Sequence, residues 1–225
     1  MTDSLHSAAA ASSVETDFFD LALRCGALRF GAFTLKSGRQ SPYFFNASAF
    51  ASGAAMTALG RLYARAVDAH GIAFDMIFGP AYKGIPLAVA LACGLALECQ
   101  RDLPYVFNRK EPKDHGEGGS LVGPPLTGRI LVIDDVISAG TSVAESAAII
   151  TRAGAILAGI VIALDREERG RDTRSATTEI ADRYQVPVIA LGHLSGLLGY
   201  LEHHAAMRAY LPEIRAYRAR YGHTP

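Results

Sequence analysis

From residue 54 to the C-terminus, short apolar segments alternate with segments of helical periodicity. The apolar segments are nearly continuous in Val, Ile, Leu and Phe, which is typical of strands buried on both faces of a parallel sheet. The alternation therefore predicts an α/β fold, an open and mainly parallel sheet with helices on both faces. The predicted strands are 75–78, 104–107, 129–133, 156–164 and 188–191, and the predicted helices are 54–69, 84–97, 142–153, 175–184 and 205–217.

The first fifty residues do not follow this alternation. We expect residues 14–50 to form a small N-terminal hood on a core of residues 51–225, within a single domain. Residues 1–13 are rich in Ser and Ala and lack the basic start and apolar run of a signal peptide, so they are expected to be a disordered tail. The predicted elements of the hood are a helix and two short extended segments, at 15–28, 33–36 and 43–46.

The charge balance restricts the class of partner. The chain has 22 basic and 22 acidic side chains, so it has no general attraction for nucleic acid or for an anionic membrane. The longest apolar stretch, residues 85–97, is too short to span a bilayer and is expected to be a buried helix. Anion binding must therefore come from local clusters, and the expected partners are small molecules.

Cysteine and lysine usage adds two observations. Cys25, Cys93 and Cys99 are odd in number and lack metal-ligand spacing, which predicts reduced, mostly buried thiols in a cytoplasmic protein. Lysines are rare beside the many arginines, and each lies in a segment that contains Gly or Pro. This placement suggests sites for a compact ammonium group, although any one of them alone is an ordinary solvated lysine. The lysines are Lys36, Lys83, Lys110 and Lys113.

The segment ILVIDDVISAGTS, residues 130–142, has the form of an anion-binding loop. An apolar strand leads to Asp134 and Asp135, and small residues then open the next predicted helix. Backbone N–H groups and hydroxyls of residues 139–142 can bind a phosphate at the helix N-terminus, while the acids can accept hydrogen bonds from sugar hydroxyls or help to hold a metal ion. The segment is not a Walker A loop, because the Gly-Lys-Ser/Thr ending is missing. The alternative is an ordinary strand-to-helix turn.

Two further loops follow predicted strands and carry positive charge. In GPAYKG, residues 79–84, Pro80 and Gly84 impose a tight path on which Lys83 can face a diphosphate. The segment that starts NRKEPKDHGEGG is basic and rich in glycine, which predicts a mobile loop over 109–123 that an anion would order. The alternatives are a simple turn and a disordered surface loop. The carboxyl ends of parallel strands share one edge, so the loops after 78, 107, 133 and 164 should share one crevice.

Residues 130–142 resemble the diphosphoribosyl-binding motif of the type I phosphoribosyltransferases. Four other segments make the chain similar to the orotate branch of that family: FTLKSGRQSPYFFN at 33–46, GPAYKG at 79–84, NRKEPKDHGEGG at 108–119 and LDREERG at 164–170. They occur in the family's order and spacing, and the resemblance extends from about Glu15 to the C-terminal helix. Ser138 is a departure, since the family usually has Thr there.

The resemblance implies a type I phosphoribosyltransferase fold and a pentosyltransferase reaction. The phosphoribosyl group of 5-phosphoribosyl 1-diphosphate would pass to N1 of orotate, giving orotidine 5′-phosphate and diphosphate in de novo pyrimidine synthesis. The resemblance also implies Mg²⁺, held mainly by substrate oxygens and water, and a homodimer with active sites shared across the interface. The alternatives are a purine phosphoribosyltransferase and a related regulator that binds nucleic acid. The regulator would need a basic surface patch, which the zero net charge does not favour.

The resemblance also assigns roles to individual residues. The diphosphate would be stabilised by Lys83, Arg109, Lys110 and Lys113, with His115 as a candidate proton donor. Asp134 and Asp135 would hold the ribose, and Lys36 would reach the diphosphoribosyl substrate. The remaining substrate-binding positions around the phosphates are Tyr82, Val136, Ile137, Ser138, Ala139, Gly140, Thr141 and Ser142.

Orotate would be placed by Phe44, Phe45, Ser138 and Arg166. Adjacent residues of a strand point to opposite faces, so one Phe ring can contact a base while the other joins the core, although two core aromatics fit the pattern equally well. Arg166 can pair with a carboxylate through two parallel hydrogen bonds, but within the run 166–169 it could also belong to a solvated charge cluster.

Overall fold

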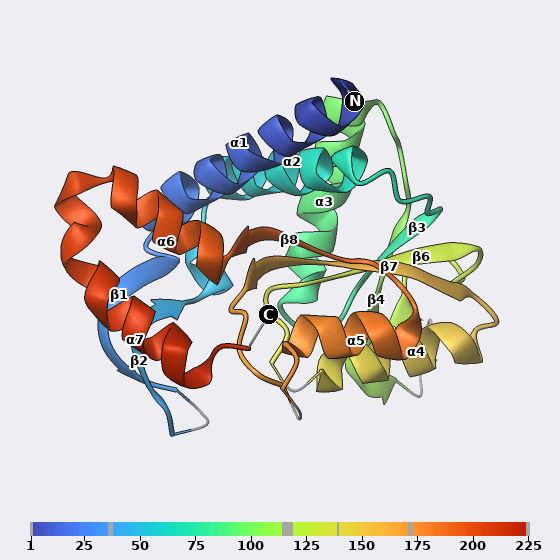
Figure 1. Ribbon diagram of the computed structural model, residues 1–225. Helices are drawn as coiled ribbons and strands as arrows, with labels where there is room; N and C mark the ends of the chain where they lie inside the picture. Colours follow the sequence, from blue (N-terminus) through green and yellow to red (C-terminus); the bar gives the residue numbers. More distant parts are fainter. Residues whose placement is uncertain (1, 36–37, 114–118, 139, 171–172, 224–225) are drawn as a thin grey trace.

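A six-stranded sheet forms the centre of the molecule (Figure 1). The computed structural model describes residues 2–35, 38–113, 119–138, 140–170 and 173–223, with side chains from residue 13 onward except 112, 113 and 119. All neighbouring strands are parallel except β4 and β5, so the predicted mainly parallel sheet is confirmed. In spatial order the strands are β5 (Gly119–Val122), β4 (Tyr105–Lys113), β3 (Met76–Gly79), β6 (Arg129–Asp134), β7 (Ile156–Asp165) and β8 (Val188–His193).

The sheet has a topological switch point between β3 and β6. From β3 the chain continues to β4 on one side, whereas β6, β7 and β8 follow one another on the other side. Connections that leave two neighbouring parallel strands in opposite directions open a crevice at the carboxyl ends of those strands. The fold thus places the residues after Gly79 and Asp134 at the position where an open α/β sheet binds its ligands.

Helices cover both faces of the sheet, as expected (Figure 1). One face carries α1 (Thr2–Arg24), α2 (Gly53–Ala69) and α3 (Gly84–Cys99), and the other carries α4 (Thr141–Arg152) and α5 (Ala176–Tyr184). Each helix layer buries its own apolar cluster against the sheet. Within the part of the chain that the structure describes, no helix has the length and apolarity needed to cross a membrane.

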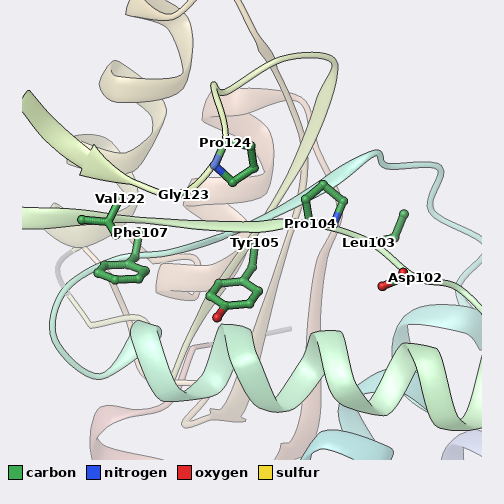
Figure 2. Close-up of a pocket in the computed structure, with 8 residues that line it drawn as sticks. All are labelled: Asp102, Leu103, Pro104, Tyr105, Phe107, Val122, Gly123 and Pro124. Atoms are coloured by element: carbon green, nitrogen blue, oxygen red, sulfur yellow. The ribbon is translucent and has the colours of Figure 1, made fainter. Parts of the chain in front are cut away.

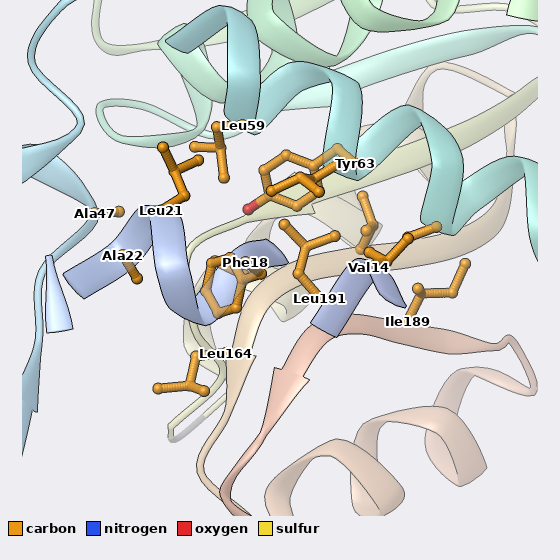
Figure 3. Packing of buried hydrophobic residues seen from close by; sticks show 14 of the residues in the cluster. Val14, Phe18, Leu21, Ala22, Ala47, Leu59, Tyr63, Leu164, Ile189 and Leu191 are labelled. Atoms are coloured by element: carbon orange, nitrogen blue, oxygen red, sulfur yellow. The ribbon is translucent and has the colours of Figure 1, made fainter. Parts of the chain in front are cut away.

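The larger cluster lies between α1, α2 and the strands β7 and β8 (Figure 3). Phe18 of α1 and Tyr63 of α2 are completely buried, and Leu164 and Leu191 are the strand residues beneath them. Burying side chains of this size stabilises the fold by about 1.5–3 kcal/mol each relative to exposure. Leu164 is the penultimate residue of β7 and the first residue of the LDREERG segment, so the core supports that segment directly.

Residues from both ends of the chain build the hood. β1 (Leu28–Thr34) and β2 (Gln40–Phe45) form an antiparallel pair, followed by the short 3-10 helix η1 (Ala47–Ala49). The C-terminal elements α6 (Leu194–His203), η2 (Ala205–Tyr210) and α7 (Leu211–Tyr221) pack beside them (Figure 1). Ring contacts join the two parts, with Phe30 stacked on Tyr210 at 4.6 Å and Tyr43 edge-on to Tyr217 at 5.8 Å between centroids. The C-terminal elements therefore pack against the segment that was expected to form the hood over 14–50.

The N-terminal segment also differs from its expectation. Helix α1 begins at Thr2, so the disordered tail expected over 1–13 is corrected to helix from residue 2. The run of alanines at 8–11 explains the extension, because Ala has the highest helix propensity. The helix ends at Arg24 rather than at residue 28, and Gly26 follows with φ of 68°, a left-handed conformation that stops a helix.

Other element boundaries differ from the predicted ones where contacts between distant parts of the chain determine the local structure. The loop predicted over 109–123 is largely a hairpin, because β4 runs on to Lys113 and β5 pairs back against it, with Val122 opposite Phe107. The helix expected at 205–217 is η2 followed by α7, with Pro212 in the first turn of α7, and α6 was not predicted. The cysteines are unpaired but not fully buried, since Cys25 and Cys99 are half-buried and Cys93 is exposed.

Helices α2 and α3 approach closely through glycine. A Cβ atom on Gly94 of α3 would lie 2.1 Å from the carbonyl oxygen of Gly60, and one on Gly60 would lie 2.1 Å from the carbonyl oxygen of Ala90. Backbone oxygens cannot move aside as a side chain can. The contact between these two helices therefore requires glycine on both sides.

We expect Gly94→Ala to lower the free energy of unfolding by about 1–3 kcal/mol, because overpacking must push α2 and α3 apart. Gly199→Ala in α6 is the matched control, since nothing lies within 4 Å of its added Cβ. That variant should be neutral or slightly stabilising. Urea denaturation measures both variants, and equal stability of Gly94→Ala and the parent protein would contradict the close approach.

Candidate active site

An ion pair spans the switch point of the sheet. Nζ of Lys83, after β3, lies 2.6 Å from Oδ2 of Asp135, after β6. The Lys83 side chain is half exposed, whereas Asp135 is buried. The prediction that the loops after β3 and β6 share one crevice is therefore confirmed. The GPAYKG and IDD motifs face each other across it.

Asp134 ties the end of β6 to the beginning of α4. Its Oδ2 accepts a hydrogen bond from Oγ of Ser142 at 2.8 Å, and its Oδ1 accepts one from the N–H of Asp135 at 2.8 Å. Burial raises the pKa of this carboxyl to about 6, although both hydrogen bonds favour the ionised form. Asp135 is arranged differently: its Oδ1 accepts a hydrogen bond from the N–H of Val136 at 3.1 Å, and its Oδ2 faces Lys83.

The segment between β6 and α4 offers backbone donors. Gly140 is the N-cap of α4 with φ of 70°, and neither a capping side chain nor an acidic residue in the first turn occupies the N-terminal N–H groups in the described structure. Such a helix end attracts an anion. Ser138 is exposed and Thr141 and Ser142 begin the helix, while Ala139 lies outside the described residues. Ile137 is buried in the second apolar cluster, so only its backbone can face a ligand.

The GPAYKG loop is anchored by a residue to which the sequence reasoning gave no role. Oδ1 of Asn108 on β4 accepts a hydrogen bond from the N–H of Ala81 at 2.8 Å. A Cβ on Gly79 would lie 2.2 Å from the carbonyl oxygen of Gly84, so the loop closes tightly on itself. Tyr82 projects into solvent with 71% exposure. The sequence signal that could have indicated this role is the position of Asn108, a polar residue directly after the apolar strand predicted at 104–107.

The basic segment after β4 is described only in part. Arg109 and Lys110 lie on β4, and Nζ of Lys110 is 4.0 Å from Oε2 of Glu145 on α4. His115 and Lys36 lie outside the described residues, as does the side chain of Lys113. Lys110 therefore reaches toward the helix whose N-terminus forms the anion loop.

The phenylalanine pair of β2 divides as the strand pattern predicts. Phe45 packs in the core against Phe18 and Phe50, with centroids 6.0 and 6.3 Å away. Phe44 stacks on Phe33 at 5.5 Å, and the guanidinium of Arg29 lies 5.6 Å from the Phe44 ring. One ring is thus committed to the core, and the other lies on the opposite face of the hood.

Arg166 is held inside the protein rather than in a solvated charge cluster. Its side chain is 20% exposed, and Nη2 lies 2.5 Å from Oε1 of Glu168 and 3.1 Å from the hydroxyl of Tyr217. Its guanidinium carbon is 5.6 Å from the ring centroid of Tyr43. The arginine after β7 is therefore presented between the core and the hood.

A surface cavity of about 560 Å³ lies along β4 (Figure 2). It extends from the segment before β4 to Phe107, which pairs with Gly79 of β3. The residues that line it are Asp102, Leu103, Pro104, Tyr105, Phe107, Val122, Gly123 and Pro124. None of the residues predicted to bind substrate lies among them.

Comparison with known proteins agrees with this arrangement. A family model described as a phosphoribosyl transferase domain matches residues 48–193. Orotate phosphoribosyltransferase from Pseudomonas aeruginosa is 56% identical over 92% of this chain and 98% of that protein. The enzyme of the same name from Cellvibrio japonicus is 55% identical over 92% and 97% of the two chains. The chain belongs to the orotate phosphoribosyltransferase family.

Two solved structures extend the match to the hood. The crystal structure of the Francisella tularensis enzyme has a TM-score of 0.82 at 40% identity and covers 91% of this chain and 98% of its own. Leishmania donovani UMP synthase matches 92% of this chain with a TM-score of 0.72 at 25% identity, over 42% of its own length. Both matches extend beyond residues 48–193 and therefore include parts of the hood.

The raised pKa of Asp134 predicts how stability depends on pH. Between its usual pKa of 3.8 and about 6, the folded state binds more protons at this site than the unfolded state. Raising the pH through this window should therefore reduce the contribution of Asp134 to stability, because the buried carboxylate becomes charged. Asp134→Asn carries no such charge, so its stability relative to the parent protein should increase from pH 4 to pH 6. Denaturation at both pH values tests this, and a constant difference would contradict it.

Proposed function

We propose that this protein transfers the phosphoribosyl group of 5-phosphoribosyl 1-diphosphate to N1 of orotate, producing orotidine 5′-phosphate and diphosphate in pyrimidine nucleotide synthesis. The observation that carries the proposal is the 2.6 Å contact between Lys83 and Asp135 at the switch point. It brings a cation suited to a diphosphate against an acid suited to ribose hydroxyls. Relatives named for this reaction match nearly the whole chain, which supports the same assignment.

We assign the sugar phosphate to the β6–α4 segment. Asp134 and Asp135 accept hydrogen bonds from the ribose hydroxyls, and the α4 N-terminus at residues 139–142 binds the 5′-phosphate. The hydrogen bond from Ser142 to Asp134 supports this assignment, because it holds the acid and the anion loop in one register. The phosphate can occupy the uncapped N–H groups of α4 without displacing any described side-chain cap.

We assign the leaving diphosphate to the basic side chains. When the bond to C1 of the ribose breaks, positive charge develops on the sugar and negative charge on the diphosphate, so stabilisation is mainly electrostatic. Lys83 exchanges its contact with Asp135 for the diphosphate, and Tyr82 and Asn108 border the same loop. The other basic residues of this group are Arg109, Lys110, Lys113 and Lys36, with His115 as proton donor. Closure of the 109–123 segment over the substrate would exclude water from the ribosyl cation.

We assign orotate to the region between the hood and the loop after β7. Arg166 binds the orotate carboxylate through its guanidinium, since Arg can match a carboxylate with two hydrogen bonds. Phe44 contacts the pyrimidine ring, while Phe45 supports it from the core. Ser138 lies in the adjoining loop and is exposed, as a ligand contact requires.

We propose Mg²⁺ as the cofactor. The described residues contain no group of three or more His, Cys, Asp or Glu side chains able to hold a metal. Asp134 and Asp135 are nevertheless oxygen donors of the kind that this hard ion prefers, and they lie beside the place proposed for the ribose. The ion would be held mainly by diphosphate and ribose oxygens and by water, and it would reduce the negative charge on the leaving group.

The reaction is tested by mixing the protein with 5-phosphoribosyl 1-diphosphate, Mg²⁺ and a panel of orotate, uracil, adenine, guanine and hypoxanthine. Diphosphate release should require orotate. Asp135→Asn should lower kcat/KM by a factor on the order of 10², as expected for the loss of a positioned polar partner. Asp182→Asn, which removes a carboxylate from a surface ion pair with Arg174, is the control and should retain activity. Release with a purine, or with no base in the panel, would refute the proposal.

We also propose that the protein is a homodimer that pairs through α3. This helix has an apolar exposed face: Leu97 is 62% exposed, Tyr82 at its start is 71% exposed, and Cys93 lies between them. Tyr105 of β4 extends the face toward the cavity shown in Figure 2. A two-fold axis pairs one apolar patch with its own copy. The unpaired thiol on this face supports a reducing, cytoplasmic location.

A shared active site predicts complementation between two inactive variants. If the basic segment closes over the partner's site, Lys113→Ala and Asp135→Asn homodimers should both be nearly inactive. A hybrid dimer contains one native site and one doubly damaged site. Subunit exchange in an equal mixture should therefore restore up to about a quarter of the activity of the unmodified protein. Inactive hybrids, shown to have formed by differently tagged subunits, would mean that each segment serves its own chain.

A further inference from the structure

Glu168 lies at the centre of a partly buried polar cluster that joins three parts of the molecule. Its Oε1 lies 2.5 Å from Nη2 of Arg166 and accepts a hydrogen bond from the hydroxyl of Tyr217 at 2.6 Å. Its Oε2 accepts a hydrogen bond from Nη1 of Arg39 at 3.2 Å. Arg166 follows β7, Arg39 precedes β2 of the hood, and Tyr217 belongs to α7. One carboxylate therefore connects the core, the hood and the C-terminal helix.

The position of Glu168 is fixed by its backbone as well. Glu168 forms an antiparallel bridge with Gly222, and its carbonyl oxygen accepts a hydrogen bond from the N–H of Ala176 at 3.2 Å. The next residue, Arg169, donates its N–H to the carbonyl oxygen of Tyr221 at 3.0 Å. The side chain is only 17% exposed. Glu168 is thus a rigid anchor rather than a mobile group that could swing away from Arg166.

The charges of the cluster do not balance. Arg39 and Arg166 are both ion-paired with the single carboxylate of Glu168, so the three groups carry one net positive charge. Burial and its hydrogen bond to Glu168 raise the pKa of Tyr217 to about 12, so this hydroxyl remains neutral. The Arg39 side chain is 36% exposed, so water screens its charge, whereas Arg166 is 20% exposed and can be further stabilised by a ligand with one negative charge.

Two polar atoms in the same place lack a well-aligned partner. Nε of Arg166 and the hydroxyl of Tyr43 are both buried and lack a well-aligned hydrogen bond in the described structure, although the two side chains interact with each other. Nη2 of Arg166 is already occupied by Glu168 and Tyr217, so the donor that remains unused is on another side of the guanidinium. Buried donors without partners are rare and indicate a missing ligand or water.

We propose that Glu168 and Tyr217 are positioning residues that hold the guanidinium of Arg166 from one side and so direct its unused donors toward the carboxylate of the base substrate. This inference rests on the proposed function, because it takes Arg166 as the residue that binds orotate. Neither positioning residue touches the substrate. Glu168 and Tyr217 hold Arg166 in one rotamer before the substrate arrives. The side chain therefore loses less conformational entropy when orotate binds.

Tyr217→Phe tests the positioning of Arg166 without changing any charge. We expect the KM for orotate to rise about 3- to 10-fold, the size of effect that immobilising one long side chain produces, with kcat and the KM for 5-phosphoribosyl 1-diphosphate nearly unchanged. Glu168→Gln should raise the KM for orotate by about tenfold, because the neutral amide is a weaker acceptor than the carboxylate and no longer fixes the guanidinium of Arg166, a loss that outweighs the added positive charge. Glu202→Gln removes a comparable carboxylate from a surface ion pair with Arg215 and is the matched control.

Two readouts separate positioning from a general structural defect. Uracil lacks the carboxylate of orotate, so its inhibition constant should change less than about twofold in both variants. In an Arg166→Ala background, Glu168→Gln and Tyr217→Phe should have no additional effect on the binding of orotate, measured by calorimetry. Circular dichroism melting confirms that each variant folds, and Tyr217→Phe preserves the test if Glu168→Gln does not fold.

Failure of the proposed function and failure of the positioning role give different results. If the unmodified protein releases no diphosphate with orotate, the proposed function fails. Three results with an active protein would refute the positioning role while the proposed function stands. The first is that the variants bind orotate normally, and the second is that the binding of uracil weakens as much as that of orotate. The third is that their effects on orotate binding add to the effect of Arg166→Ala.

Discussion

Burial of a carboxylate at the end of a central strand is the constraint on which the candidate site depends. Moving the charge of Asp134 out of water is unfavourable, and the protein compensates by surrounding the group with donors. Those donors come from Ser142 and from the N–H of Asp135. The consequence is geometric, because the first turn of α4 must approach the end of β6. The segment between them is thereby shaped into a loop with N–H groups that no described side chain caps.

A second set of carboxylates organises the beginning of α6. Glu15 of α1 accepts hydrogen bonds from the N–H of His193 at 2.8 Å and from its Nδ1 at 3.1 Å, and this contact raises the pKa of the imidazole. Glu167 accepts hydrogen bonds from the N–H and hydroxyl of Ser195 at 2.8 and 2.7 Å. Both acids thus lie at the N-terminus of α6, where negative charge is favourable. Helix α6 is in this way joined to α1 and to the loop that carries Arg166.

Much of the core and the positions of several candidate site residues could be predicted, because the information is local. A β-branched apolar run followed by Asp134 and Asp135 predicts both a buried strand and acids at its end, and the structure has both. The alternation of Phe44 and Phe45 across β2 is equally local. Strand β5 was missed because a four-residue segment of Gly, Ser, Leu and Val has little character of its own and is extended only because β4 pairs with it. Helix α6 was missed because its apolar residues resemble the end of a strand segment until β8 is known to end at His193.

The sequence by itself determined five of the six strands of the central sheet, the order of the loops that follow them and the chemical character of each loop. All of these follow from residues adjacent in the chain, whose periodicity and side-chain types are directly visible. Only the tertiary structure decided that Lys83 faces Asp135, that Asn108 holds Ala81, and that Arg166 is braced rather than solvated. The brace joins Arg39 to Glu168 across 129 positions of the chain, and Tyr217 follows another 49 positions later. No local pattern records such contacts, because they exist only after the two ends of the chain have packed together over the edge of the sheet.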